Sequence, residues 1–244
     1  MPVYQLPDEI VFPSPEEAEP SGLLAVGGDL SVARLLLAYS AGIFPWYAPG
    51  DPILWWSPDP RLVLEPSGLR VSKSLKRTVK KGVYTVTVDR AFERTIRACA
   101  RAERSRDEGT WIVDDMIEAY TRLHQSGFAH SVETWQAGEL VGGLYGVSIG
   151  KAFFGESMFS ARRDASKVAL VYLAGMARRW DMDFIDCQIT TGHLVRMGAG
   201  EVARSDFLER LRRAVESPTR CGTWVLPEGL ELLPQAAGAR TCGQ

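Results

Sequence analysis

The sequence lacks most of the motifs that common metal and cofactor sites require. Its four cysteines form no Cys-x-x-Cys pair, and its three histidines, His124, His130 and His193, follow no metal-ligand spacing. These residues therefore favour neither a zinc site nor a redox dithiol. There is also no Walker sequence and no Gly-x-Gly-x-x-Gly loop, so the common nucleotide cofactors are not indicated. We predict a protein without a metal or a cofactor.

The chain also lacks a long apolar run and an excess of charge of either sign. Its longest apolar run, from Val168 to Ala177, is too short to cross a bilayer, which needs about 20 residues. The first twenty residues contain prolines and acids, where a secretory signal needs a basic start and an unbroken apolar stretch. Lys and Arg total 28 against 30 Asp and Glu. We therefore expect a cytoplasmic protein that contacts no membrane and binds any polyanion only locally.

Composition and hydrophobic pattern divide the chain into two parts. Up to about residue 60 it is rich in glycine, proline and aromatics, with five aromatics between Phe44 and Trp56. From Arg61 onward, strand-like and helix-like patterns alternate, which is typical of a mixed α/β domain. We predict a small N-terminal domain over residues 1–60, a larger mixed α/β domain over 61–227 and a flexible tail over 228–244.

Local signals predict the order of elements in the larger domain. A capping box at Asp115 and Glu118 predicts a helix that ends at Gly127. Alternating residues with a turn at Gly138 then predict a hairpin over residues 130–149. A strand over 151–159, a mostly buried helix of about sixteen residues capped by Asp164, and a short strand over 184–188 follow.

A cluster of basic residues lies just inside the larger domain. Lys73, Lys76, Arg77 and Lys80 are spaced i, i+3, i+4 and i+7, and no acid occurs between residues 65 and 89. This spacing places the four charges on one helix face. The stripe is either a solvated surface or a contact for a phosphate backbone, since like charges on one face repel each other unless an anion neutralises them.

Three polar residues interrupt apolar strands. Asp186 and Gln188 are two residues apart in FIDCQ, which places them on one face of a strand, and Glu156 shares a face with Phe154 and Met158. A carboxylate in such a run needs a partner, because desolvation otherwise neutralises it. Each acid alone is compatible with an ion pair or a helix cap. Two acids and a glutamine on strands of one domain favour a functional site.

Nine longer segments follow in order along the chain: GLLAVGGDLS (22–31), AYSAGIFPWY (38–47), ILWWSPDPR (53–61), EGTWI (108–112), AHSVETW (129–135), LVGGLYGV (140–147), FFGESMFS (153–160), DASKVAL (164–170) and FIDCQ (184–188). They resemble the bacterial leucyl/phenylalanyl-tRNA–protein transferases over most of the chain. The resemblance implies a larger domain similar to the GCN5-type N-acetyltransferase fold. It also implies a monomeric, cofactor-free enzyme. Such an enzyme transfers leucine or phenylalanine, and also methionine, from leucyl-tRNA or phenylalanyl-tRNA to proteins with N-terminal Arg or Lys, which marks them for N-degron proteolysis.

The resemblance also assigns roles to individual residues. It makes Asp186, Gln188 and Glu156 the catalytic group. It assigns the aminoacyl-adenosine to Trp46, Trp111, Tyr39 and Tyr120, the amino-acid side chain to Leu144, Phe153, Met158, Leu170 and Ile185, and the tRNA backbone to Lys73, Lys76, Arg77 and Lys80. Strict strand alternation separates Ile185 from Asp186 and Phe153 from Glu156. Pocket and carboxylates can therefore meet only at a strand end, a twist or a bulge, and Gly155 offers a bulge.

Two other functions remain open from the sequence. An acyl-CoA-dependent N-acetyltransferase shares the expected fold, but it needs a glycine-rich basic loop for pyrophosphate, where this chain has Asp164-Ala-Ser-Lys167. A non-catalytic RNA-binding module explains the basic stripe and the aromatics. It gives Asp186, Gln188 and Glu156 no role.

Overall fold

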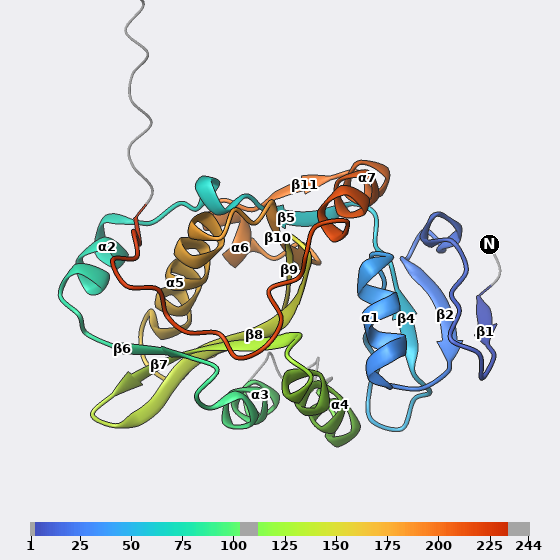
Figure 1. Cartoon of the computed structure of the whole chain (residues 1–244), viewed down its shortest axis with the longest axis horizontal. Coiled ribbons are helices and arrows are strands. Elements are labelled where there is room, and N and C mark those ends of the chain that lie inside the picture. Colours follow the sequence, from blue (N-terminus) through green and yellow to red (C-terminus); the bar gives the residue numbers. More distant parts are fainter. Residues whose placement is uncertain (1–2, 103–111, 234–244) are drawn as a thin grey trace, which may run out of the picture.

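The computed structural model describes residues 3–102 and 112–233, and it contains two β-sheets (Figure 1). The smaller sheet has the order β1-β2-β4-β3 and lies next to helix α1, Val32–Ser40. Its strands are β1 Tyr4–Leu6, β2 Leu23–Gly27, β3 Phe44–Pro45 and β4 Leu54–Trp56, with a 3-10 turn at Pro15–Glu17. Ser31 caps α1, because its side chain accepts a hydrogen bond from the Arg34 amide.

The larger sheet has seven strands in the order β11-β5-β10-β9-β8-β7-β6. The strands are β5 Arg61–Leu64, β6 Thr85–Val88, β7 Ala129–Gln136, β8 Glu139–Ile149, β9 Ala152–Ser160, β10 Phe184–Gln188 and β11 Gly200–Val202. The helices are α2 Lys73–Lys80, α3 Phe92–Arg101, α4 Asp114–Gln125, α5 Ala165–Arg179, α6 Gly192–Arg196 and α7 Arg204–Val215, with a 3-10 turn at Pro66–Gly68. Helix α5 covers one face of the sheet, and α3 and α4 cover the other (Figure 1).

The order of helix, hairpin, strand, helix and strand predicted for the larger domain is confirmed, as is the mixed α/β class. The hairpin turns through Ala137 and Gly138, which both have positive φ angles. Helix α5 is buried along most of its length, as its apolar sequence predicts. The capping box is wrong: α4 begins at Asp114, so Asp115 lies in its first turn and caps nothing.

Strands β9 and β10 run parallel, and their pairing is short. Only three residue pairs join them, and the ladder ends where Asp186 faces Phe154. Beyond that pair, β9 continues to Ser160 and pairs only with β8. The sheet therefore opens between β9 and β10, which provides space for a cavity.

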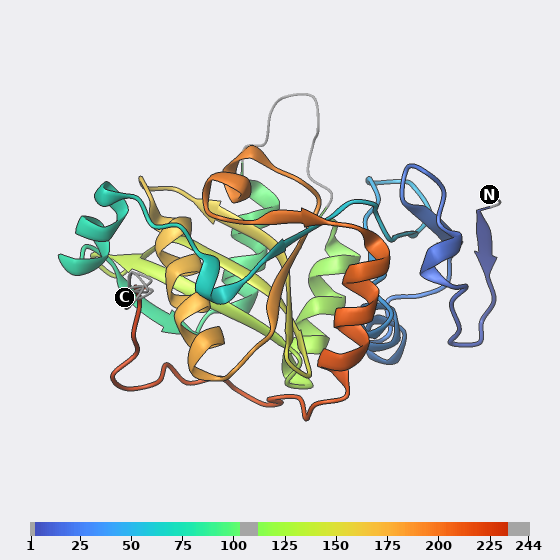
Figure 2. The same ribbon diagram turned by 90° about the horizontal axis from the view of Figure 1, so that it is seen from above.

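The chain after α7 runs along one edge of the larger domain (Figure 2). Trp224 stacks on His130, with ring centroids 3.8 Å apart. Residues 228–233, expected to belong to a flexible tail, instead pack against α5, where Arg178 donates to the Glu231 carbonyl at 2.8 Å. The remainder of the expected tail, residues 234–244, lies outside the described residues. No helix in the described ranges is both long and apolar enough to span a membrane.

Candidate functional site

A cavity of about 890 Å³ lies where β9 and β10 separate. Its walls come from β8, β9, β10, α5 and α6, and from the aromatic segment at residues 44–49. All five apolar residues predicted for the side-chain pocket line it: Leu144, Phe153, Met158, Leu170 and Ile185. Apolar walls of this kind suit an apolar ligand group of the size of leucine or phenylalanine.

Two β-bulges turn polar side chains toward this cavity. On β9, Ser157 pairs with Tyr145 and Gly155 with Gly146, so Glu156 is the unpaired extra residue. On β10, Asp186 pairs with Val63 and Gln188 with Leu62, so Cys187 is the extra residue there. The bulge beside Gly155 was predicted, and it explains why Glu156 and Phe153 line the same cavity.

Glu156 and Gln188 belong to the polar part of the wall, together with Ser157, Thr190, Thr191 and His193. Both side chains are at least nine-tenths buried, and the Gln188 amide donates to Glu156 Oε1 at 2.7 Å. On the far side, the Tyr120 hydroxyl donates to Glu156 Oε2 at 3.0 Å. Burial raises the pKa of Glu156 from 4.5 to about 7, although hydrogen bonds from Tyr39, Tyr120 and Gln188 oppose this effect. Near neutral pH, Glu156 can therefore either accept or release a proton.

Asp186 does not line the cavity. Its carboxylate is fully buried and accepts two hydrogen bonds from Arg61, at 2.9 and 2.7 Å. It also accepts from the Gln188 backbone amide at 2.8 Å, where Gln188 has a φ of 60°. The prediction that Asp186 and Gln188 share a strand face is wrong, because the bulge at Cys187 breaks the alternation. Asp186 instead fixes the backbone that carries Gln188.

Arg61 is a buried residue of the candidate site that was not predicted from the sequence. Its guanidinium lies between the rings of Phe44 and Phe207, 4.9 and 4.5 Å from their centroids, and donates to the Gly42 carbonyl at 3.2 Å. It therefore links the aromatic segment near the cavity to the strand that carries Gln188. One signal was available: Arg61 begins the apolar strand RLVL, and a buried arginine needs an anionic partner.

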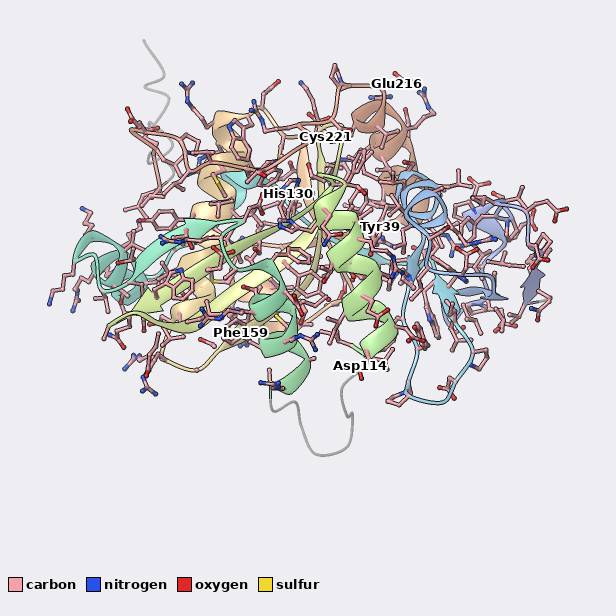
Figure 3. The ribbon with its side chains drawn as sticks, turned by 60° about the horizontal axis from the view of Figure 1, so that its bottom comes forward. Tyr39, Asp114, His130, Phe159, Glu216 and Cys221 are labelled. Atoms are coloured by element: carbon pink, nitrogen blue, oxygen red, sulfur yellow. The ribbon has the colours of Figure 1, made fainter. Side chains whose placement is uncertain are left out.

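The described residues that were predicted to hold the adenosine lie in two places: Trp46 at the cavity, and Tyr39 and Tyr120 behind its wall. Trp46 lines the cavity with 37 % of its surface exposed. Tyr39 and Tyr120 are fully buried behind Glu156 and do not line the cavity, and their contact with the adenosine stays a prediction. Tyr39 lies where α1 faces α4 (Figure 3). Trp111 lies outside the described residues.

The basic stripe forms as predicted. Lys73, Lys76, Arg77 and Lys80 are exposed on α2, while Leu75 is buried. None of these four basic residues lines the cavity. Within the described ranges, no group of three or more His, Cys, Asp or Glu side chains is placed to hold a metal ion.

Two other side chains of reactive types, Cys187 and Ser148, are not in settings that make them nucleophiles. Cys187 lines the cavity, but burial raises the pKa of its thiol, so the nucleophilic thiolate is scarce at neutral pH. Residues 146–150 spell Gly-x-Ser-x-Gly, and the structure places them along β8 with Ser148 buried. A nucleophile elbow requires a strand-to-helix turn, so Ser148 is not such a nucleophile.

Comparison with known proteins identifies the chain. A family model described as leucyl/phenylalanyl-tRNA protein transferase matches residues 63–212, and the model of that family's N-terminal domain matches residues 28–59. A leucyl/phenylalanyl-tRNA–protein transferase of Anaeromyxobacter sp. (strain Fw109-5) is 61 % identical over 94 % of this chain and 97 % of its own. A leucyl/phenylalanyl-tRNA–protein transferase of Solidesulfovibrio magneticus is 63 % identical over 93 % of this chain and 92 % of its own. A solved structure of L-PGS from Bacillus licheniformis is more distant, with 11 % identity and a TM-score of 0.39 over 69 % of this chain and 53 % of that one.

These matches make the chain an enzyme of the aminoacyltransferase class. It belongs to the leucyl/phenylalanyl-tRNA protein transferase family, as its sequence motifs predicted.

Proposed function

We propose that this enzyme transfers leucine or phenylalanine, and also methionine, from aminoacyl-tRNA to the α-amino group of proteins that begin with Arg or Lys. The observation that carries the proposal is the cavity: an apolar recess whose described lining includes one carboxylate, Glu156, on a bulge in its wall. The recess fits the aminoacyl side chain, and the acid fits a cationic or amine-bearing N-terminus. The product, now with an N-terminal Leu or Phe, would then enter N-degron proteolysis.

The reaction needs little from the protein beyond placement and a proton acceptor. An α-amine has a pKa of about 7.7–8.0, so a substantial part is unprotonated near neutral pH. Its nitrogen attacks the ester carbonyl, the C–N bond forms, and the bond to the ribose oxygen of the tRNA breaks. The surplus proton of the amine passes to Glu156, and the departing ribose oxygen regains a proton to leave as a hydroxyl. Holding ester and amine in contact contributes several kcal/mol to the rate, and general-base assistance adds about 10²–10⁴-fold.

We assign the groups around the cavity as follows. Trp46 stacks on the terminal adenosine, where such stacking is worth about 1–3 kcal/mol per base. Gln188 orients the incoming amine and Glu156. Asp186 acts through the backbone of Gln188 and is a positioning residue.

The decisive experiment measures transfer of labelled leucine from charged tRNA to peptides that differ only in their first residue. We expect product with N-terminal Arg and Lys and little with Ala or Glu. The same enzyme mixed with acetyl-CoA should give no acetylated peptide. Acetyl transfer without leucyl transfer would establish the acetyltransferase alternative, and tight RNA binding without turnover would establish the RNA-binding module.

We further propose that the basic stripe on α2 binds the tRNA backbone. Reversing two charges, with Lys76→Glu and Arg77→Glu together, should weaken charged-tRNA binding and reduce the slope of log K against log salt by about one to two. The matched control is Arg212→Glu on α7, because the Arg212 charge is already paired with Glu216 at 2.9 Å. Equal slopes for the stripe variant and the wild type would remove α2 from the tRNA interface.

A further inference from the structure

Two tyrosine hydroxyls meet behind Glu156. Tyr39 comes from α1 and Tyr120 from α4, and neither side chain has any exposed surface. Their hydroxyls are hydrogen-bonded to each other, and Tyr120 also donates to Glu156 Oε2 at 3.0 Å. Their rings are held by aromatic neighbours: Tyr39 packs on Phe154, with centroids 5.1 Å apart, and Tyr120 packs on Tyr145 at 5.8 Å. The hydroxyls are therefore fixed in position relative to Glu156.

Tyr120 donates its single hydroxyl proton to the carboxylate, so Tyr39 donates to the Tyr120 oxygen and the two hydroxyls form a chain of donors that ends on Glu156. Burial raises the pKa of each phenol well above its ordinary value of 10, so neither ionises near neutral pH. Glu156 has no cationic partner among the described side chains that contact it, and the nearby Asp186 carboxylate on β10 raises its pKa further. Its negative charge is instead met by Tyr120 on Oε2 and by Gln188 on Oε1. A carboxylate that accepts hydrogen bonds in its ionised form is favoured in that form, which counteracts its desolvation.

We propose that Tyr39 and Tyr120 are positioning residues that keep Glu156 available as the proton acceptor of the transfer reaction. The inference rests on the proposed function and extends it from the cavity wall to the layer behind the wall. Tyr120 acts on the carboxylate directly, and Tyr39 acts mainly by fixing the Tyr120 hydroxyl. A carboxyl group that already carries a proton cannot take one from the amine. Loss of either hydroxyl therefore lowers the fraction of enzyme that is ready to react.

The test is the pH profile of single-turnover transfer for Tyr120→Phe and Tyr39→Phe, which keep the rings and remove the hydroxyls. The assay uses saturating charged tRNA and a peptide that begins with Arg. In the plot of transfer rate against pH, the acidic limb for Tyr120→Phe should lie about one pH unit higher than that of the wild type. That move corresponds to a roughly fivefold slower transfer at pH 7 and nearly full recovery at pH 9. Tyr39→Phe should move the limb the same way by less. The amine of the peptide titrates identically with every enzyme, so it cancels in the comparison.

The matched control is Tyr84→Phe, because the Tyr84 hydroxyl also makes one hydrogen bond, to the Arg163 carbonyl at 2.7 Å, away from the cavity. Its pH profile should coincide with that of the wild type. If Tyr120→Phe does not fold, 3,5-difluorotyrosine at position 120 gives the opposite test: its more acidic hydroxyl donates more strongly, so the acidic limb should move to lower pH.

The outcomes separate this proposal from the proposed function. If the wild type transfers leucine but the Tyr120 variants keep its pH profile, the positioning role is wrong and the proposed function stands. Weaker binding of charged tRNA by Tyr120→Phe at every pH, with an unshifted limb, would overturn the positioning role in favour of adenosine contact. If the wild type transfers no amino acid to any peptide, the proposed function itself fails.

Discussion

Replacing Glu156 with glutamine should stabilise the protein at alkaline pH and leave it catalytically impaired. Burial raises the pKa of Glu156 to about 7 in the folded chain, from an ordinary value of 4.5. The folded state therefore holds the proton more tightly than the unfolded state, and the free energy of unfolding falls as pH rises from about 4.5 to 7. Since one pH unit corresponds to 1.36 kcal/mol, the ionised carboxylate costs about 3 kcal/mol at pH 8. A neutral amide of the same shape avoids this cost.

The measurement is urea unfolding of the wild type and Glu156→Gln at pH 5 and pH 8. The stability advantage of the variant should grow from about 1 kcal/mol at pH 5 to about 3 kcal/mol at pH 8. All other titrating groups are common to both proteins and cancel in the difference. The control is Glu216→Gln, at an exposed carboxylate paired with Arg212, for which we expect no comparable change with pH. A gap between wild type and Glu156→Gln that is equal at the two pH values would refute the reasoning.

Two further predictions concern the frame of the cavity. Arg61→Met should lower the free energy of unfolding by about 3–5 kcal/mol, because it leaves the buried Asp186 carboxylate unpaired. Adding Asp186→Asn should then recover part of that loss in urea unfolding, and an additive double variant would contradict the ion-pair account. Gly146→Ala should destabilise the chain by about 3 kcal/mol, because a Cβ there would lie 2.2 Å from the Phe154 carbonyl oxygen. The matched control is Gly155→Ala, which should be tolerated because its Cβ would lie 3.5 Å from the Asp186 carbonyl oxygen. Equal melting temperatures for the two variants would contradict the described packing.

The local elements could be predicted from the sequence because their signals are local. Helix α1 begins after a capping serine, and α2 forms with its charges on one face. The hairpin of β7 and β8 turns at an Ala-Gly pair with left-handed backbone. The bulge at Glu156 was also within reach, since a glycine in an otherwise regular strand often marks one.

The rest of the site depends on contacts between distant parts of the chain. Asp186 meets Arg61 across 125 positions of sequence, and Tyr39 meets Tyr120 across 81. The second bulge falls at Cys187, where no glycine or proline marks it. Without that bulge, period-two alternation places Asp186 at the cavity beside Gln188. The resemblance could assign these residues to a site, but it could not say which of them reach the cavity and which lie behind it.

The two carboxylates near the cavity differ in how their charge is balanced, and this difference separates their roles. Asp186 has a full counter-charge in Arg61, held by two short hydrogen bonds, and it has no exposed surface. Among the described side chains, neutral groups of Tyr120 and Gln188 donate hydrogen bonds to Glu156. Loss of the Asp186 carboxylate would leave the Arg61 charge without its partner in the protein interior, whereas no described cation is paired with Glu156. This contrast supports the proposal that Glu156 takes the proton of the reaction, while Asp186 holds the backbone of Gln188 in place.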